Sequence, residues 1–172
     1  MSTPPMRIHL HDPEATLNLG RRLAECLVRE HIRPAILLHG DLGAGKTTLI
    51  RGLVPALPGG ADAEVSSPSF NIVNLYPTTP ATAHFDLYRL EGLGLEGDLE
   101  EQLHDPDLLR LVEWAEYLAP GDHPDDLLSL TWEPCSRGRT LSLHARGEQG
   151  TRLLECLRSL LPASDRITHG RH

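Results

Sequence analysis

One stretch of the sequence decides the fold: Leu37-Leu38-His39-Gly40-Asp41-Leu42-Gly43-Ala44-Gly45-Lys46-Thr47-Thr48. It contains the pattern Gly-x-x-x-x-Gly-Lys-Thr, which is typical of a loop that cradles phosphate groups. Glycines let the backbone curl so that successive N–H groups point into one concavity, where an anion is stabilised. The positive end of the following helix dipole adds to this stabilisation. The pattern therefore predicts a phosphate-binding P-loop between a strand and a helix.

Three side chains at the end of this loop carry its chemistry. Lys46 is expected to reach the β- and γ-phosphates of a nucleotide, and the Thr47 hydroxyl is expected to ligate Mg²⁺. Thr48 is in position to donate a hydrogen bond to the α-phosphate. An apolar strand before the loop and a helix after it supply the context that the motif requires. We therefore expect a nucleotide site formed by Asp41, Leu42, Gly43, Ala44, Gly45, Lys46, Thr47 and Thr48.

The remaining pattern predicts one α/β domain. Its expected strands are Met6–His11 at an edge, Ala35–Leu38 buried on both faces, Phe70–Tyr76, Ala83–Tyr88, Leu111–Trp114, Leu127–Trp132 and Thr140–His144. Its expected helices run from Pro13 to about Glu30 behind an Asp12 N-cap, from Lys46 to about Ala56, in parts of Glu91–Leu111, and over Thr151–Leu161. The sum is a P-loop NTPase-like three-layer sandwich around a mixed parallel and antiparallel sheet. Residues 1–162 are expected to form this single domain and residues 163–172 a disordered tail.

Composition limits the classes of partner. The formal net charge is −8, from 16 basic and 24 acidic residues. Because nucleic acids are held mainly through their phosphates, such a chain is a poor candidate for holding RNA unaided. No apolar run approaches the roughly eighteen residues that span a membrane, and Met1–Leu10 does not resemble a signal peptide. We therefore expect a cytoplasmic protein without membrane attachment.

The cysteines are spaced far apart. Cys26, Cys135 and Cys156 form no Cys-x-x-Cys pair. This spacing argues against a disulfide framework or a zinc site and is typical of a protein in a reducing compartment.

Two acidic residues follow apolar strand patterns and are candidates to hold magnesium and orient the attacking water. Strand periodicity places Asp86 on one face with His84 and Tyr88. Glu113 follows Leu111-Val112 at the carboxyl end of another short strand, where ligands gather in open α/β sheets. By spacing alone the two carboxylates are near-equal candidates for the metal. We expect the catalytic residues to be Lys46, Asp86 and Glu113, and the metal ligands to be drawn from Thr47, Glu113 and Asp86.

A hydroxyl-rich segment, Ser66-Ser67-Pro68-Ser69-Phe70, precedes the third expected strand. Hydroxyl groups near a γ-phosphate can form a nucleotide-sensing switch. The same pattern is also typical of a loop that ends in a proline turn. The sequence leaves these two interpretations open.

Five segments together resemble the TsaE (YjeE) family in their order and spacing. They are Ala15–Gly20, Gly40–Thr48, Ser67-Pro68-Ser69-Phe70, His84-Phe85-Asp86-Leu87-Tyr88-Arg89 and Leu111-Val112-Glu113-Trp114. The resemblance covers Leu10 to Trp114 and extends loosely into the C-terminal hairpin and helix. The family usually has threonine or tyrosine where this chain has Ser69, and the segment Glu91–Asp98 does not align with it.

The resemblance implies a small bacterial ATPase that uses Mg²⁺. Such a protein supports the threonylcarbamoyl modification of the tRNA adenosine beside the anticodon. It binds a heterodimer of TsaB and TsaD and touches tRNA only indirectly or within that complex. The resemblance also implies that Lys46 is the phosphate lysine, Thr47 the magnesium threonine, and Asp86 and Glu113 the acidic pair, with Glu113 the usual metal ligand. It places Thr16 near the nucleotide base and Trp114 next to the site.

Three other classes of function remain to be weighed. A small-molecule kinase is the main alternative and needs an arginine-bearing lid, for which Arg137 and Arg139 are the local candidates. A GTPase switch would need an Asn/Thr-Lys-x-Asp segment to recognise guanine. The single lysine of the chain, Lys46, lies in the P-loop, so the sequence contains no such segment. A binding module that holds ATP as a structural ligand would show no turnover. We therefore expect an ATPase whose turnover is slow, because the sequence offers no arginine finger in cis.

Overall fold

The computed structural model describes residues 3–167 and contains a seven-stranded sheet with four α-helices. The strands are β1 (Met6–Leu10), β2 (Ala35–His39), β3 (Val73–Tyr76), β4 (Thr82–Asp86), β5 (Leu109–Glu113), β6 (Leu127–Glu133) and β7 (Arg139–Arg146). The helices are α1 (Pro13–Glu30), α2 (Lys46–Leu53), α3 (Asp98–His104) and α4 (Gly147–Leu160). Within the described residues, no helix is long and apolar enough to cross a membrane.

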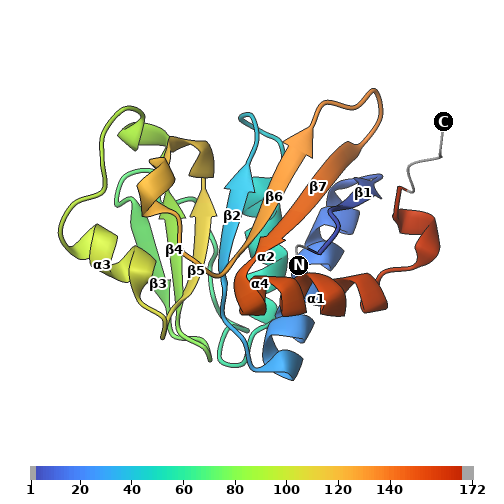
Figure 1. Cartoon of the computed structure of the whole chain (residues 1–172), viewed down its shortest axis with the longest axis horizontal. Coiled ribbons are helices and arrows are strands. Elements are labelled where there is room, and N and C mark those ends of the chain that lie inside the picture. Colours follow the sequence, from blue (N-terminus) through green and yellow to red (C-terminus); the bar gives the residue numbers. More distant parts are fainter. Residues whose placement is uncertain (1–2, 168–172) are drawn as a thin grey trace.

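The strand order is β1-β7-β6-β2-β5-β4-β3, which Figure 1 shows from right to left. The four central strands β6, β2, β5 and β4 are parallel to one another. Antiparallel partners flank them on both sides, with β7 and β1 at one edge and β3 at the other. The predicted mixed sheet and both predicted hairpins are therefore confirmed.

Two apolar clusters cover the two faces of the sheet. One face packs against α1, α2 and α4, and its cluster includes Leu23, Leu38 and Leu153. The other face packs against α3 and short 3₁₀ turns through Leu37, Phe85 and Leu103. These layers form the predicted three-layer sandwich in one domain. The strand β2 lies between them and is buried on both faces, as its unbroken apolar sequence predicts.

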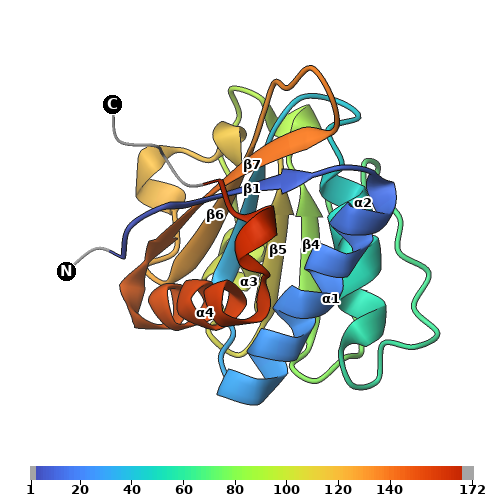
Figure 2. The same cartoon turned by 90° about the vertical axis from the view of Figure 1, so that its right-hand side faces the viewer.

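Helix α1 begins where the sequence predicts. The Asp12 side chain accepts a hydrogen bond from Ala15 N over 2.8 Å, and Pro13 occupies the first helical position. Figure 2 shows α1 and α2 side by side. The two helices approach closely because glycines face each other: a Cβ added to Gly52 would lie 2.1 Å from Leu17 O, and one added to Gly20 would lie 2.2 Å from Leu49 O. Helix α1 therefore packs rigidly against the helix that begins at the P-loop.

Two expected elements differ at their ends. The strand expected from Phe70 begins only at Val73, because Ile72 N donates to Pro68 O over 2.7 Å and closes a turn. The strand expected through Tyr88 ends at Asp86, and Tyr88 begins a 3₁₀ turn. The expected alignment of Tyr88 with His84 and Asp86 on one strand face is therefore wrong.

The described part of the C-terminal tail differs from the disordered segment expected there. Residues Ala163–Asp165 form a 3₁₀ turn, and Ile167 N donates to Arg7 O over 2.8 Å. This segment therefore pairs with β1, whose position at the edge of the sheet leaves hydrogen-bonding groups available. The remainder of the expected tail, residues 168–172, lies outside the described residues.

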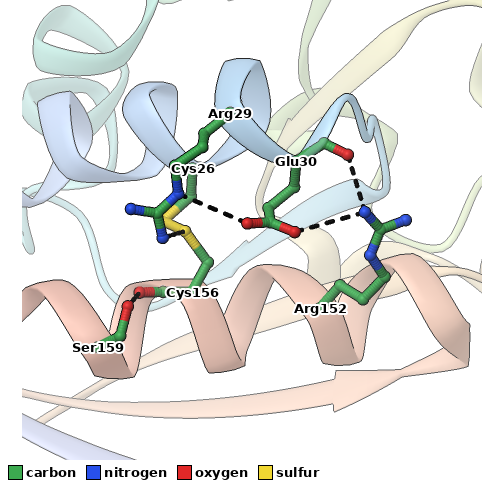
Figure 3. Close-up of polar contacts among 6 residues, drawn as sticks. All are labelled: Cys26, Arg29, Glu30, Arg152, Cys156 and Ser159. Atoms are coloured by element: carbon green, nitrogen blue, oxygen red, sulfur yellow. Dashed lines mark hydrogen bonds and ion pairs between the residues drawn. A yellow bond between two sulfur atoms is a disulfide. The ribbon is translucent and has the colours of Figure 1, made fainter.

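The expectation of no disulfide is wrong. Cys26 of α1 and Cys156 of α4 are bonded, with their Cα atoms 5.8 Å apart (Figure 3). A sequence separation of 130 residues does not prevent this bond, because the two helices pack against each other in the folded chain. Arg29 donates to Cys156 Sγ over 2.9 Å, and Glu30 pairs with Arg152 of α4 at 3.4 Å. The α1–α4 contact thus combines a covalent bond with a hydrogen bond and an ion pair.

Candidate functional site

Three parallel strands bring the predicted site residues to one edge of the sheet. Strand β2 leads into the P-loop, while β5 ends at Glu113 and β4 ends at Asp86. In the sheet register, Leu38 of β2 pairs with Glu113, and Glu113 pairs with Asp86. Because all three strands run in the same direction, their carboxyl ends lie together at the edge of the sheet where β2 leads into the P-loop.

The P-loop has the backbone conformation that its glycines allow. Gly43 and Gly45 have φ angles of 75° and 120°, in the region that L side chains rarely adopt. Helix α2 follows directly, so the N–H groups of its first turn have no partners within the helix. The loop therefore presents backbone donors and a helix N-terminus to one concave surface, which is the arrangement that binds phosphate.

Lys46 lies over this concave surface. Its ammonium group donates to the carbonyl groups of Gly40 and Asp41, the latter over 2.9 Å. It also lies 4.0 Å from the centre of the Trp114 ring. Burial lowers the pKa of Lys46, and nearby carboxylates, Glu116 and Glu113 foremost, offset part of that effect. The charge is thus held at the loop by carbonyl oxygens and an aromatic face that an anionic ligand can replace.

The first turn of α2 is joined directly to the end of β5. The Thr47 hydroxyl donates a hydrogen bond to Glu113 Oε1 over 2.5 Å. Glu113 is only 2% exposed. Burial alone would raise the pKa of Glu113, but His84, the Thr47 hydroxyl and the Lys46 charge together outweigh burial and lower it. The carboxylate is therefore kept ionised beside the hydroxyl.

Asp86 lies on the other side of Ser67. Ser67 Oγ donates to Asp86 Oδ2 and lies 3.3 Å from Glu113 Oε2, so it bridges the two carboxylates. The second oxygen of Asp86 accepts from Tyr88 N over 3.0 Å. The hydroxyl-rich segment Ser66–Phe70 thus contributes one side chain, Ser67, to the site.

Two residues near the acids have strained backbones. Ile72 and Trp114 have φ angles of 67° and 57°, which are unfavourable for non-glycine residues and most of all for a β-branched one. Trp114 directly follows Glu113, and Ile72 O accepts a hydrogen bond from Asp86 N. Such strain gathers at functional sites, where surrounding contacts enforce a required geometry.

A cleft of about 220 Å³ joins these groups. It is lined by Leu42, Gly43, Ala44, Gly45, Lys46, Thr47, Thr48, Ser67, Asp86, Glu113 and Trp114. A larger cleft of about 490 Å³ lies along α1 and β1 and includes neither the P-loop nor the acids. The chemistry of the lining residues, rather than the volume, therefore identifies the candidate site.

Two of the predicted nucleotide-binding residues lie beside this cleft rather than in its lining. Thr16 is buried behind the loop, with its Cγ2 3.7 Å from where a Cβ on Gly45 would lie. Asp41 lines a neighbouring cleft of about 300 Å³ between the P-loop and the β6–β7 hairpin. Trp132 and Arg139 line the same cleft, and Arg139 Nε donates to Ala44 O over 3.3 Å.

The donor set of the main cleft fits magnesium. Mg²⁺ prefers oxygen ligands and is commonly bound by one or two carboxylates, water and substrate phosphates. Thr47, Glu113 and Asp86 supply oxygens of this kind at one end of the P-loop. Among residues 3–167 there is no cluster of three or more His, Cys, Asp or Glu side chains suited to a metal, so such a site depends on nucleotide phosphates as well.

Three side chains of this region are absent from the predicted site residues. Ser67 was recognised only as part of a segment with two interpretations, and its contact with both acids depends on the turn at Pro68–Ile72. His84 shares a strand face with Asp86 and lies 3.7 Å from Glu113. Trp132 lies behind Gly45, a position set by the pairing of β6 with β2. The sequence gave a signal for two of the three, through the hydroxyl-rich segment of Ser67 and the alternation of His84 with Asp86, and none for Trp132.

Known proteins are similar to this chain in sequence and in fold. The sequence model of the family described as threonylcarbamoyl adenosine biosynthesis protein TsaE matches residues 10–141. The TsaE of Haemophilus influenzae, named as a tRNA threonylcarbamoyladenosine biosynthesis protein, is 38% identical over 114 residues, covering 63% of this chain and 70% of that protein. The protein of the same name from Synechocystis is 42% identical over 123 residues, covering 69% of this chain and 75% of that protein.

A solved structure extends the comparison to the fold. The crystal structure of YdiB from Bacillus subtilis superposes with a TM-score of 0.71 and covers 92% of this chain and 97% of its own, at 24% sequence identity. The structural match supports the three-layer fold, and the matched segment contains the P-loop, Ser67, Asp86 and Glu113. From the family match over residues 10–141, we conclude that this chain belongs to the TsaE family of threonylcarbamoyl adenosine biosynthesis proteins.

Proposed function

We propose that this protein is a magnesium-dependent ATPase that supports threonylcarbamoyl modification of the tRNA adenosine next to the anticodon. One observation carries the proposal: the Thr47 hydroxyl at the end of the P-loop contacts the buried Glu113 carboxylate over 2.5 Å. A hydroxyl and a carboxylate brought together at the phosphate-binding end of a helix form the metal-binding half of a P-loop nucleotide site. The names of the relatives supply the link to tRNA modification.

Each side chain has a distinct part in this proposal. Lys46 binds the β- and γ-phosphates in place of the carbonyls of Gly40 and Asp41. Thr47 and Glu113 hold Mg²⁺, which neutralises charge that develops on the transferred phosphoryl group. Asp86 orients the water for in-line attack, since the Ser67 hydroxyl contacts both carboxylates and so links Asp86 to Glu113.

Slow turnover of the isolated chain follows from what lines the cleft. Lys46 is the one cationic side chain among the described residues of that lining. An arginine finger raises turnover in P-loop enzymes by about 10³–10⁵-fold. We therefore infer that the TsaB–TsaD heterodimer is the partner that makes hydrolysis productive, and that tRNA is bound by that complex rather than by this acidic chain. The setting is the cytoplasm, where ATP and tRNA are both present.

The base of the nucleotide is proposed to lie beyond Gly45. Thr16 and the Trp132 indole nitrogen lie 3.7 Å and 3.4 Å from the position of a Cβ on that glycine. An added side chain at Gly45 would therefore enter the space between the P-loop and these two residues. ATP is the proposed nucleotide because the family resemblance implies it.

A small-molecule kinase remains the second candidate. The favouring observation is Arg139, which reaches Ala44 O of the P-loop from the β6–β7 hairpin, while Arg137 is exposed. Arg139 lines the neighbouring cleft with Asp41 and Trp132, and not the cleft with Glu113. This placement favours the ATPase, because a lid arginine must reach the transferred phosphoryl group.

The test is ATP hydrolysis by the purified chain, alone and with TsaB–TsaD and tRNA, beside a Glu113→Ala variant. The proposal predicts slow turnover alone, faster turnover with the partners, and loss of both in the variant. Turnover that ignores the partners would contradict the proposed role. Phosphoryl transfer to a metabolite with little hydrolysis in its absence would instead favour the kinase.

A further inference from the structure

One buried side chain near the site, His84, makes no hydrogen bond through its polar atoms. His84 is 0% exposed, and neither of its ring nitrogens makes a hydrogen bond. Buried polar groups are almost always hydrogen-bonded, because an unpaired one costs folding free energy. An apolar residue of similar size would fill the same space without that cost. The histidine at this position therefore calls for an explanation beyond packing.

The position of the ring points to Glu113. His84 lies two residues before Asp86 on β4, so both side chains project from the same face of the strand. His84 Nε2 lies 3.7 Å from Glu113 Oε2. The ring also stacks on Tyr76, with ring centres 6.3 Å apart. The imidazole thus contacts both an aromatic ring and the carboxylate.

The two oxygens of Glu113 have different surroundings. Oε1 accepts the hydrogen bond from Thr47, and it is therefore the oxygen that faces the end of the P-loop. Oε2 faces Ser67 at 3.3 Å and His84 at 3.7 Å. Because a carboxylate rotates about its terminal bond, groups that engage Oε2 also decide where Oε1 points. Ser67 comes from a loop, whereas His84 comes from the central part of a strand.

We propose that His84 is a positioning residue, which holds Oε2 of Glu113 so that Oε1 stays turned toward Thr47 and the magnesium. This inference rests on the proposed function, since it concerns the geometry of the metal ligand. Residues that orient the ligands of a metal usually affect its affinity by about 10- to 100-fold when they are replaced. The same fold-change is expected here.

A purely structural histidine would behave differently. If His84 only filled the core, replacing it would leave the metal dependence of nucleotide binding unchanged. If it positions Glu113, His84→Met should weaken the metal dependence of nucleotide binding, because Met keeps a side chain of similar reach but offers no N–H group to Oε2. His84→Gln retains an N–H donor at the distance of Nε2 and should recover most of the metal effect.

The test measures binding of the β,γ-imido analogue of ATP by calorimetry, once with saturating Mg²⁺ and once with excess EDTA. We expect His84→Met to lose about 10- to 100-fold in affinity with Mg²⁺ and nothing in EDTA. His84→Gln should lie close to the wild type. The exposed His144 of β7 provides the matched control, and His144→Met should match the wild type in both conditions.

The outcomes separate this inference from the function on which it rests. Wild-type binding that Mg²⁺ strengthens, with the same strengthening in His84→Met, would overturn the positioning role alone. An equal loss in Mg²⁺ and in EDTA would also overturn it, because the histidine would then act on the whole fold. Wild-type protein that binds the analogue no better than Lys46→Ala would overturn both proposals.

Discussion

The Thr47 hydroxyl donates to Glu113 Oε1 over 2.5 Å across 66 residues of sequence. This hydrogen bond joins the first turn of α2 to the end of β5, so the phosphate-binding loop and the buried acid are fixed relative to each other. The bond connects a helix to a strand of the sheet on which that helix packs. The position of any magnesium held by Thr47 is therefore determined by the sheet as well as by the loop.

Glu113→Gln tests the charge of this acid while preserving its shape. The glutamine carbonyl can still accept from Thr47, but it no longer supplies an anionic oxygen for Mg²⁺. We expect ATP turnover to fall by roughly 100-fold or more, since removing one electrostatic group from a catalytic site costs about 10²–10³ in rate. Steady-state phosphate release measures the change. Turnover within a few-fold of the wild type would show that Glu113 does not hold the metal.

The wild type and Glu113→Gln can also be compared in how their stability depends on pH. The folded state lowers the pKa of Glu113, because His84, Thr47 and Lys46 outweigh its burial. A lowered pKa contributes stability that is present above the unfolded value of about 4.3 and is lost as pH falls through the folded value. The stability of the wild type relative to Glu113→Gln should therefore decrease as the pH falls below about 5. Urea unfolding at several pH values measures it, and a constant difference would refute the assignment.

Gly52→Ala tests the close approach of α1 and α2. A Cβ at Gly52 would lie 2.1 Å from Leu17 O, so one helix must shift. We expect a loss of about 1–3 kcal/mol in unfolding free energy, as for other overpacked cores. The control is Gly94→Ala, where an added Cβ meets no atom within 4 Å and the change should stay within about 0.5 kcal/mol. Equal stability of the two variants would contradict the packing described.

The disulfide gives a fourth prediction. Cys26 and Cys156 close a loop over a separation of 130 residues, and such a crosslink restricts the unfolded chain. Reduction should cost about 2–5 kcal/mol and lower the melting temperature by about 4–20 °C. The double variant Cys26→Ala/Cys156→Ala should not respond to the reductant. A wild-type melting temperature that is indifferent to reductant, with three free thiols counted throughout, would show that the bond does not form.

Much of the framework was predictable because it depends on local pattern. The strand before Gly40, the capping of α1 by Asp12 and the hairpins each follow from a few neighbouring residues. The convergence of Asp86 and Glu113 followed from a general rule, since both lie at the carboxyl ends of parallel strands.

The remaining features depend on contacts between distant segments. The bridge from Ser67 to both acids requires a turn in which Ile72 adopts a φ of 67°, and no residue pattern favours that angle for isoleucine. The bond between Cys26 and Cys156 requires the packing of α4 on α1, which spacing along the chain does not reveal. The tail was expected to be disordered from its polar composition, yet Ile167 pairs with Arg7 at the sheet edge.

The central claim is that the P-loop binds the phosphates of ATP, and calorimetric titration with the β,γ-imido ATP analogue in Mg²⁺ tests it most directly. The wild type and Lys46→Ala are compared, because Lys46 is the cationic group at the loop. We predict saturable binding to the wild type and an affinity lower by at least about tenfold in the variant, as expected for a charged hydrogen bond. Equal affinity of the two proteins, or no binding by the wild type, would contradict the account.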